Sequence, residues 1–426
     1  MKNIIYKTFF LLALVALVSC QEETPGKYKM TDGVPTIKYV RYSGNENPDR
    51  LLDGALMGEN IVLVGDNFTS IKELYFNDQK ASLNINFITA NTLFTSVPTG
   101  VPQERTDKIW MVTGSGERVS YDFEVRIPAP KLDKIKCEML PEDAEAVLYG
   151  DYFFDSNLKI FIGNTEIPAA SIISIEKTAL KFKAPAMNVT GPVTVSTSFG
   201  VSKPTVAWFN DMRGYLTGFE DSENDGTGFV AGWGRPEKIE NEATYSLMGK
   251  YAKFQGEIEN GSWSTGSPGM VINIWSAANT DNPNAGLSDP LFTSDPATSV
   301  LKFEINVVDS WSALPMIFCF KATNDKEGWL WADGTQPRAF WMPWQGTTEG
   351  YKTEGWETVT IPISSMIYNG SFAEVGMPTS FGELGIAIHN RGYGIDTEKK
   401  YCGIDISGSV KHTPLILIDN VRVVPQ

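Results

Sequence analysis

A repeated pattern in the first half of the chain constrains its fold most strongly. The segment ENIVLVGDNFTSIKELYFN, residues 59–77, matches EAVLYGDYFFDSNLKIFIGN, residues 145–164, at an offset of about 85 residues. Each copy runs from an alternating apolar strand through a Gly-Asp step and an aromatic residue into a second strand. Further strand pairs follow at a similar offset, so the repeat predicts two small all-β domains in tandem.

The second half of the chain also predicts β-structure. From about Asn210, short alternating or apolar runs are separated by Gly, Asn, Asp and Pro, and no segment has a long helical period with caps. These runs favour a single larger β-sandwich of the jelly-roll type. The predicted segments are an N-terminal signal peptide (1–19), a flexible linker (20–34), two immunoglobulin-like (Ig-like) domains (35–127 and 128–208) and a C-terminal β-sandwich (209–426).

The N-terminus has the features of an export signal. Lys2 and Lys7 bracket a positively charged stretch. An apolar run, Phe9–Val18, follows it and is too short to span a membrane comfortably. The run ends in Leu-Val-Ser-Cys, which resembles a bacterial lipobox closed by Cys20. We therefore expect Cys20 to be acylated and to tether the chain to a membrane that it does not span.

Charge and residue usage exclude several classes of function. The formal net charge is −15 and Lys and Arg form no cluster, which argues against nucleic acid as a partner. The other cysteines, Cys137, Cys319 and Cys402, have no C-x-x-C spacing and only two His to help them, so we expect no zinc site. Cys319 lies in the apolar run MIFCFK and is predicted to be buried. The sequence does not exclude a disulfide bond formed by Cys137.

Tryptophan is concentrated in the C-terminal half. Nine of the eleven Trp follow residue 209, and four lie in the turn-rich segment GWLWADGTQPRAFWMPWQG, residues 328–346. A core usually accommodates such rings singly, so some of the four are expected to face outward. The alternation predicts a packed side formed by Phe340, Met342 and Trp344. It predicts exposed rings at Trp329, Trp331 and Trp341.

Exposed rings among amide and charged side chains suit sugars, because an aromatic face stacks on the C–H face of a pyranose while polar groups bind its hydroxyls. Trp311 lies in a polar loop and is predicted to be exposed, whereas Trp356 opens a strand and is predicted to be structural. Gln336 and Asn273 are further polar candidates. The predicted glycan-binding residues are Trp275, Trp311, Trp329, Trp331, Asp333, Arg338, Phe340 and Trp341.

Two other classes of function stay open at this point. A glycoside hydrolase would need two suitably separated carboxylates, and Glu349, Glu354 and Glu357 lie near the aromatic segment. An adhesive surface protein could use the same rings to bind another protein. We expect no cofactor, although a structural calcium ion is possible, and its weak candidate ligands are Asp221, Asp225 and Asp419.

The organisation resembles a known family. The tandem repeats resemble IPT/TIG domains, and Pro343-Trp344, Gly350 to Thr353 and Gly355 to Pro362 are similar to a pattern of xyloglucan-binding domains. With its lipobox and Trp-rich terminal sandwich, the chain resembles the cell-surface glycan-binding lipoproteins of Bacteroidetes. The acidic Gln-Glu-Glu after Cys20 resembles their signal for the outer face of the outer membrane.

The resemblance implies a non-catalytic protein that captures a β-glucan or xyloglucan for a starch-utilisation-type transporter. It also implies that the transporter complex and a companion glycan-binding lipoprotein are partners. Since neither repeat shows an aromatic cluster in its sequence, both are predicted to be spacers, and a fragment from about Asn210 to Gln426 is expected to bind polysaccharide nearly as well as the whole ectodomain.

Overall fold

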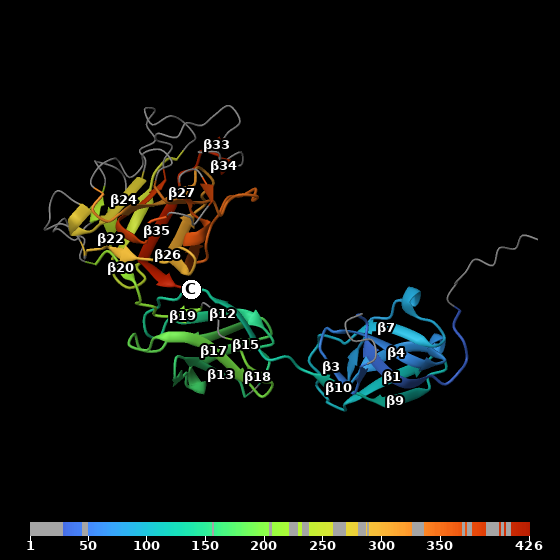
Figure 1. Cartoon of the computed structure of the whole chain (residues 1–426). Helices are drawn as coiled ribbons and strands as arrows, with labels where there is room; N and C mark the ends of the chain where they lie inside the picture. Colours follow the sequence, from blue (N-terminus) through green and yellow to red (C-terminus); the bar gives the residue numbers. More distant parts are fainter. Residues whose placement is uncertain are drawn as a thin grey trace, which may run out of the picture. The chain divides into compact units, whose positions relative to one another are not determined.

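The structure, a computed structural model, is all-β in the part of the chain that it describes, as the sequence predicted (Figure 1). No helix in this part is long and apolar enough to cross a membrane. The described residues are 29–44, 50–155, 157–203, 207–220, 229–231, 238–258, 270–279, 287, 289–325, 336–368, 371–372, 377–388, 400–401, 404–405 and 410–426.

The first repeat forms two four-stranded antiparallel sheets, ordered β2-β1-β4-β7 and β6-β5-β8-β9, and a parallel pair of β3 with β10. Two short 3₁₀ turns, η1 (Phe68–Ser70) and η2 (Ile85–Phe87), connect its strands. The strands are β1 (Thr36–Tyr42), β2 (Leu51–Leu52), β3 (Gly54–Leu56), β4 (Asn60–Asp66), β5 (Ile71–Phe76), β6 (Gln79–Lys80), β7 (Thr92–Ser96), β8 (Lys108–Thr113), β9 (Arg118–Asp122) and β10 (Glu124–Arg126).

The second repeat has the same plan, with sheets ordered β11-β12-β16-β15 and β14-β13-β17-β18, and β19 added beside β17. Its 3₁₀ turn η3 (Ala169–Ser171) precedes β15. The strands are β11 (Lys131–Ile135), β12 (Glu145–Asp151), β13 (Lys159–Ile162), β14 (Thr165–Glu166), β15 (Ile172–Glu176), β16 (Ala179–Lys183), β17 (Gly191–Thr197), β18 (Gly200–Val201) and β19 (Trp208–Phe209).

The Gly-Asp step of the repeat has the same structural cause in both copies. The register of the first strand pair shifts beside Gly65 in one copy and beside Gly150 in the other. A Cβ atom at these glycines would lie 1.8 Å from the carbonyl oxygen of Thr36 and 1.9 Å from that of Lys131. Only glycine fits such a close approach of two strands at a bulge.

The C-terminal sandwich consists mainly of a six-stranded and an eight-stranded sheet. The six-stranded sheet has the order β22-β23-β35-β26-β29, with β20 beside β35. The eight-stranded sheet has the order β21-β24-β32-β27-β28-β30-β31, with β25 beside β32. Figure 1 shows strands of both sheets, among them β26, β35, β24 and β27, in this part of the chain.

The bounds of its elements follow from the alternating runs in the sequence. They are β20 (Tyr215–Thr217), β21 (Phe229–Ala231), β22 (Lys238–Glu240), β23 (Tyr251–Gln255), β24 (Met270–Trp275), η5 (Ala277–Asn279), β25 (Phe292–Thr293), β26 (Ser299–Asp309), β27 (Met316–Ala322), β28 (Arg338–Trp341), β29 (Glu357–Pro362), η6 (Ile363–Ser365), β30 (Ile367–Tyr368), β31 (Ser371–Phe372), β32 (Ser380–Ile388), β33 (Lys400–Tyr401), β34 (Ile404–Asp405) and β35 (Leu415–Pro425).

Side chains from both sheets meet in one continuous core. Phe303 of β26 and Phe318 of β27 are fully buried, and their ring centroids lie 4.9 Å apart across the space between the sheets. This contact identifies the inward face of each strand, because side chains alternate along a strand. The architecture confirms the predicted two Ig-like sandwiches followed by a larger β-sandwich.

The chain divides into two compact units, residues 1–128 and 129–426, so the second repeat and the C-terminal sandwich belong to one unit. A buried ionic network connects them. Glu138 of the second repeat accepts hydrogen bonds from Lys302 Nζ at 2.6 Å and from Arg422 Nη2 at 2.9 Å. Arg422 also donates to Glu304 at 2.8 Å, and all four side chains are at most about 5% exposed.

Candidate functional site

The outer face of the eight-stranded sheet collects polar and aromatic side chains in two rows. Arg338, Cys319, Gly385 and Asn273 are consecutive neighbours across β28, β27, β32 and β24. The adjacent row contains Lys321, Glu383 and Trp275. Since Phe318 points inward, these residues at alternate positions point outward. The face crosses three inter-strand spacings, about 14 Å in all.

The centre of this face is buried and charged. Lys321, Arg338 and Glu383 are all less than a tenth exposed. Burial raises the pKa of Glu383 to about 7, and the positive charge of Lys321 beside it acts in the opposite direction. A carboxyl group with such a pKa changes its charge near neutral pH, so this face does not keep one fixed charge.

Two polar atoms at the β24 side of the face have no hydrogen-bond partner in the described part of the chain. They are Asn273 Oδ1 and Trp275 Nε1, both buried. Buried polar atoms are normally hydrogen-bonded, and leaving one unpaired costs on the order of 1–3 kcal/mol. Asn273 Oδ1 is a hydrogen-bond acceptor and Trp275 Nε1 is a donor, and the two residues lie on the same face of β24. A ligand that carries hydroxyl groups can form hydrogen bonds with both atoms.

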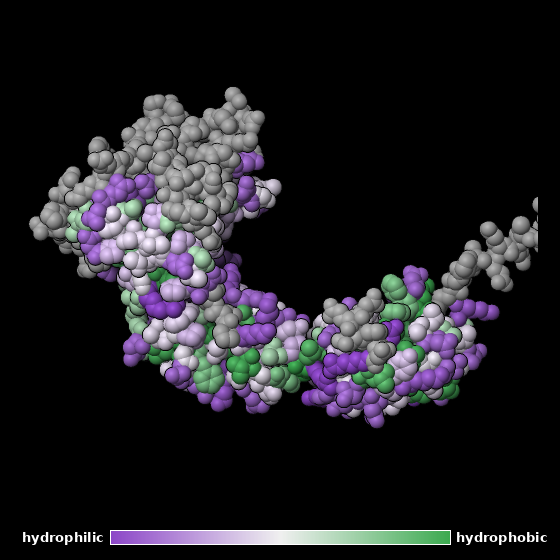
Figure 2. Space-filling model, in the orientation of Figure 1, coloured by the Kyte–Doolittle hydropathy of each residue, from purple (hydrophilic) through white to green (hydrophobic). Residues whose placement is uncertain are grey.

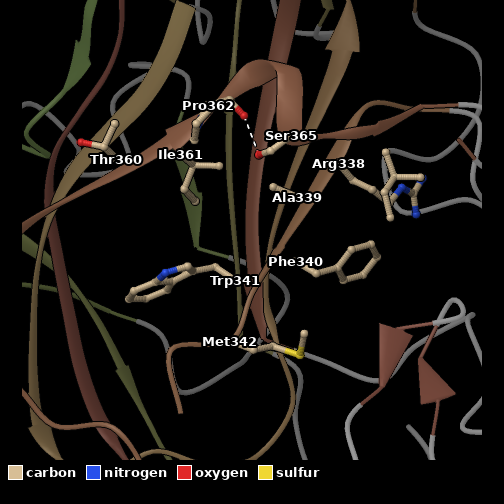
Figure 3. Close-up of a pocket in the computed structure, with 10 residues that line it drawn as sticks. Arg338, Ala339, Phe340, Trp341, Met342, Thr360, Ile361, Pro362 and Ser365 are labelled. Atoms are coloured by element: carbon tan, nitrogen blue, oxygen red, sulfur yellow. Dashed lines mark hydrogen bonds between the residues drawn. The ribbon is translucent and has the colours of Figure 1, made fainter. Parts of the chain in front are cut away.

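A pocket of about 330 Å³ lies at the opposite side, where β28 meets the edge strand β29 of the other sheet. Figure 3 shows Phe340 and Arg338 on one side of β28 and Trp341 on the other. Thr360, Ile361 and the other residues from β29, η6 and β30 form the facing wall. The pocket is therefore largely apolar, with hydroxyl groups only at its rim.

Trp341 is held firmly in the pocket wall. Its ring lies 5.7 Å from that of Trp311, 5.9 Å from Phe303 and 5.6 Å from Tyr351, measured between centroids. Trp341 nevertheless remains partly exposed. A partly exposed ring with three aromatic neighbours presents a fixed surface, which reduces the entropy lost when a ligand stacks on it.

The prediction that Trp311 is exposed is wrong. Trp311 is fully buried, and its Nε1 donates to the carbonyl oxygen of Ala313 at 2.7 Å. Its backbone also forms a β-bridge with Tyr351, so the polar loop in which it lies turns the ring inward. The ring therefore supports Trp341 and does not present a surface to a ligand.

The predicted sides of the returning strand are also partly wrong. Trp344 is buried, as predicted, and donates from Nε1 to Leu314 O at 3.2 Å. Phe340 and Met342 were expected to pack and Trp341 to be exposed, yet all three are partly buried and Trp341 faces the space between the sheets. The alternation was correctly predicted, but it does not say which side faces the second sheet.

The remaining candidates have mixed outcomes. Arg338 is buried and its Nε donates to Gln336 O at 3.2 Å, so it is a structural part of the site. Trp275 is partly buried on the outer face described above. Trp356 is partly buried between the second repeat and the C-terminal sandwich, in agreement with its predicted structural role. Trp329, Trp331, Asp333, Cys20, Cys402, Asp221 and Asp225 lie outside the described residues.

The described cysteines, Cys137 and Cys319, and the calcium candidate Asp419 are all buried. Cys319 is fully buried, as predicted, and burial raises the pKa of its thiol to about 12. The Cys137 thiol is buried and donates to Met139 O at 3.3 Å. Asp419 is buried beside Asn420, and the described part of the chain contains no cluster of three or more metal-ligating side chains.

Several residues of the site were not predicted. Lys321 and Glu383 lie 62 positions apart and become neighbours only through the pairing of β27 with β32. Ile361, Pro362 and Ser365 come from a run that predicted a strand without indicating its partner. The register of two strands depends on contacts that the sequence of one strand does not contain.

The comparison with known proteins identifies the family. Residues 209–425, about half of the chain, match the model of the surface glycan-binding protein B xyloglucan binding domain. The chain belongs to this family. The matched range begins in β19 and includes both sheets of the C-terminal sandwich, so it contains the outer face and the pocket.

Individual relatives agree with this assignment. The crystal structure of the surface glycan-binding protein PbSGBP-B from Prevotella bryantii is 31% identical, with a TM-score of 0.64, and the match covers 93% of this chain and 100% of that one. An IPT/TIG domain-containing protein from Bacteroides ovatus is 29% identical over 150 residues, which are 34% of this chain. The match spans only 29% of that relative's length.

Proposed function

We propose that this protein captures a β-glucan or xyloglucan at the cell surface and does not cleave it. The name of the matched family model supports xyloglucan as the ligand class. The observation that carries the proposal is the pocket at β28, which the partly exposed Phe340 and Trp341 line from opposite sides of the strand, together with the hydroxyl-bearing Thr360 and Ser365 (Figure 3).

The pocket suits the chemistry of a neutral sugar. Phe340 and Trp341 offer apolar faces on which the C–H face of a pyranose can stack. Ser365 Oγ, which donates to Pro362 O at 2.7 Å, keeps lone pairs that can accept from a sugar hydroxyl. Asn273 and Trp275 lie on β24, three strand spacings from β28, so a ligand that contacts both places must span several sugar units and reach their buried polar atoms.

The lining of the pocket favours binding over hydrolysis. Glycoside hydrolysis ordinarily needs two carboxyl groups that flank the scissile bond. None of the described residues that line the pocket is acidic. The buried Glu383 lies on the outer face beside Lys321, and the described row in which it lies contains no second carboxyl group.

A panel of polysaccharides tests the proposed function. Affinity gel electrophoresis of the ectodomain should show retardation by xyloglucan or mixed-linkage β-glucan, and little retardation by a polyanion such as pectin, because the protein is itself acidic. Incubation with the retarding glucan should release no new reducing ends. Equal migration in all gels would contradict the ligand class, and new reducing ends would contradict the absence of catalysis.

We also propose that Cys20 is lipidated and anchors the protein at the outer membrane beside a starch-utilisation-type transporter and a companion glycan-binding lipoprotein. The Leu-Val-Ser-Cys sequence after an apolar run supports the anchor. Replacement Cys20→Ala should leave the precursor unprocessed or release the protein from the membrane. Antibody labelling of intact cells measures this, and wild-type labelling of the variant would contradict the proposal.

A further inference from the structure

The first repeat carries an exposed apolar patch around η2 and β7. Ile85 is 55% exposed, Phe87 is 56% exposed and Phe94 is 41% exposed. The rings of Phe87 and Phe94 lie 6.5 Å apart between centroids, with their planes 55° apart. Figure 2 shows a hydrophobic cluster on the part of the first repeat that carries β7. Two neighbouring exposed phenylalanines are unusual on a soluble domain and indicate a binding surface.

The second repeat shows that the fold does not require these rings. Phe94 pairs with Val62 in the first copy, and Lys181 pairs with Val147 at the equivalent position of the second. Lys181 there forms an ion pair with Glu145 at 2.9 Å. A charged pair thus occupies the place of the exposed ring, and the sheet forms equally well.

The 3₁₀ turns of the two copies lead to the same conclusion. η2 and η3 are both three residues long, and an isoleucine, Ile88 or Ile172, follows each as its C-cap. Phe87 corresponds to Ser171 in the turn and to Ser174 in the strand register, so a serine stands at its position in either alignment. Two positions that are polar or charged in one copy are both phenylalanine in the other, and these two rings are neighbours.

The surroundings of the rings indicate the chemistry of the partner. The stretch ASLNINFITANTLFTSV, residues 81–97, contains no charged residue, although 20% of the chain is charged. It contains amide and hydroxyl side chains instead, among them the exposed Asn84 and Asn86. An uncharged surface of rings, amides and hydroxyls suits a neutral ligand with apolar faces and hydroxyl edges.

We infer that the η2–β7 patch of the first repeat is a second glycan-binding site, which takes a neutral polysaccharide by stacking on Phe87 and Phe94. This changes the spacer role predicted from the sequence, since the two rings are seven residues apart and become a pair only in the folded domain. The inference does not depend on the β28 pocket, because the two sites share no residue.

The test uses the full ectodomain labelled with 4-fluorophenylalanine. Millimolar xyloglucan oligosaccharide should shift the ¹⁹F resonances of Phe87 and Phe94, which are assigned by their loss in Phe87→Ser and Phe94→Lys. These replacements copy the second repeat, so the fold should tolerate them. A weak second site should also raise the affinity for long polymer about twofold to tenfold, and the double variant should lose this gain.

Replacement Ile173→Ser removes an apolar side chain that is 50% exposed on the second repeat, and it is the matched control, for which we expect no loss. Unshifted Phe87 and Phe94 resonances, or an unchanged affinity of the folded double variant for long polymer, would overturn the inference. Shifts caused by a partner protein and not by glycan would also overturn it. Failure of the β28 site has a different signature: high-affinity oligosaccharide binding is absent, while millimolar glycan still shifts these two resonances.

Discussion

The two outer faces of the C-terminal sandwich both bury polar side chains, but these side chains have different partners. On the six-stranded sheet, Lys302 and Arg422 bind Glu138, which the second repeat supplies. On the eight-stranded sheet, Asn273 and Trp275 keep buried polar atoms without a partner in the described part of the chain. The six-stranded sheet also contains unpaired buried atoms, Arg422 Nε and Asn420 Nδ2, so the faces differ in that another domain supplies the ionic partner of one of them.

This difference separates assembly from recognition. A buried charge without a partner destabilises the fold, so Lys302 and Arg422 on the six-stranded face depend on Glu138 of the second repeat. A face with unpaired polar atoms and a neighbouring aromatic pocket gains free energy when a hydroxyl-bearing ligand arrives. The second repeat is therefore a structural part of the glycan-binding unit, which makes it more than a spacer.

The largest expected effect comes from breaking the six-stranded face. Replacement Glu138→Ala leaves Lys302 and Arg422 buried with fewer partners, which should lower the free energy of unfolding by about 3–5 kcal/mol. Urea denaturation measures the change. Glu145→Ala on the same repeat removes an exposed ion pair and should have little effect. Equal stability of both variants would contradict the structural role of Glu138.

The ionic network of Glu138, Lys302 and Arg422 also changes which truncated fragments we expect to fold. The sequence predicted that residues 210–426 bind nearly as well as the whole ectodomain, but this fragment lacks Glu138 and the contacts of Trp356 with the second repeat. We now expect a fragment from Ala129 to be stable and one from Asn210 to be poorly folded. Indistinguishable melting curves of the two fragments would contradict this expectation.

The next effect concerns the core beneath the pocket. Trp344 is buried and bonded to Leu314 O, so Trp344→Ala should cost about 3–5 kcal/mol of folding free energy. The loss should appear in denaturation before any specific effect on binding. Met212→Ala is a suitable control, since Met212 is 54% exposed and its loss should change stability little. A Trp344 variant as stable as the control would contradict the packing described here.

A smaller effect should appear with pH. Because the pKa of Glu383 is raised to about 7 in the folded protein, the folded state binds a proton that the unfolded state releases near pH 4.5. The contribution of Glu383 to stability is therefore fully present below about pH 4.5 and is lost as the pH rises to about 7, a change of about 1–3 kcal/mol. Glu383→Gln should flatten this part of the pH profile, whereas Glu349→Gln should not. An unchanged profile for Glu383→Gln would contradict the assigned burial.

The sequence predicted the architecture well, because the evidence for it is local. The Gly-Asp step recurs at Gly65 and Gly150, and alternation marks strands such as β26 and β27 one by one. The family resemblance agreed with the matched domain model over residues 209–425.

The site was less predictable, because it depends on pairing. Alternation placed Trp341 and Phe340 on opposite sides of a strand but could not say which side meets the second sheet. Trp311 lies in a polar loop, yet its bridge to Tyr351 turns it inward. Lys321 and Glu383 meet only through the register of β27 and β32, and no local pattern encodes that register.

The binding of xyloglucan oligosaccharide to Phe340→Ala tests the central claim most directly. Phe340 lines the pocket but is only partly buried, so its truncation should reduce affinity by about 1–3 kcal/mol, a tenfold to hundredfold effect, with little change in melting temperature. Tyr149→Ala, an exposed ring on the second repeat, is the control. Calorimetric titration should show weakened binding for the first variant alone. Wild-type affinity in a folded Phe340→Ala variant would contradict the placement of the glycan site at β28.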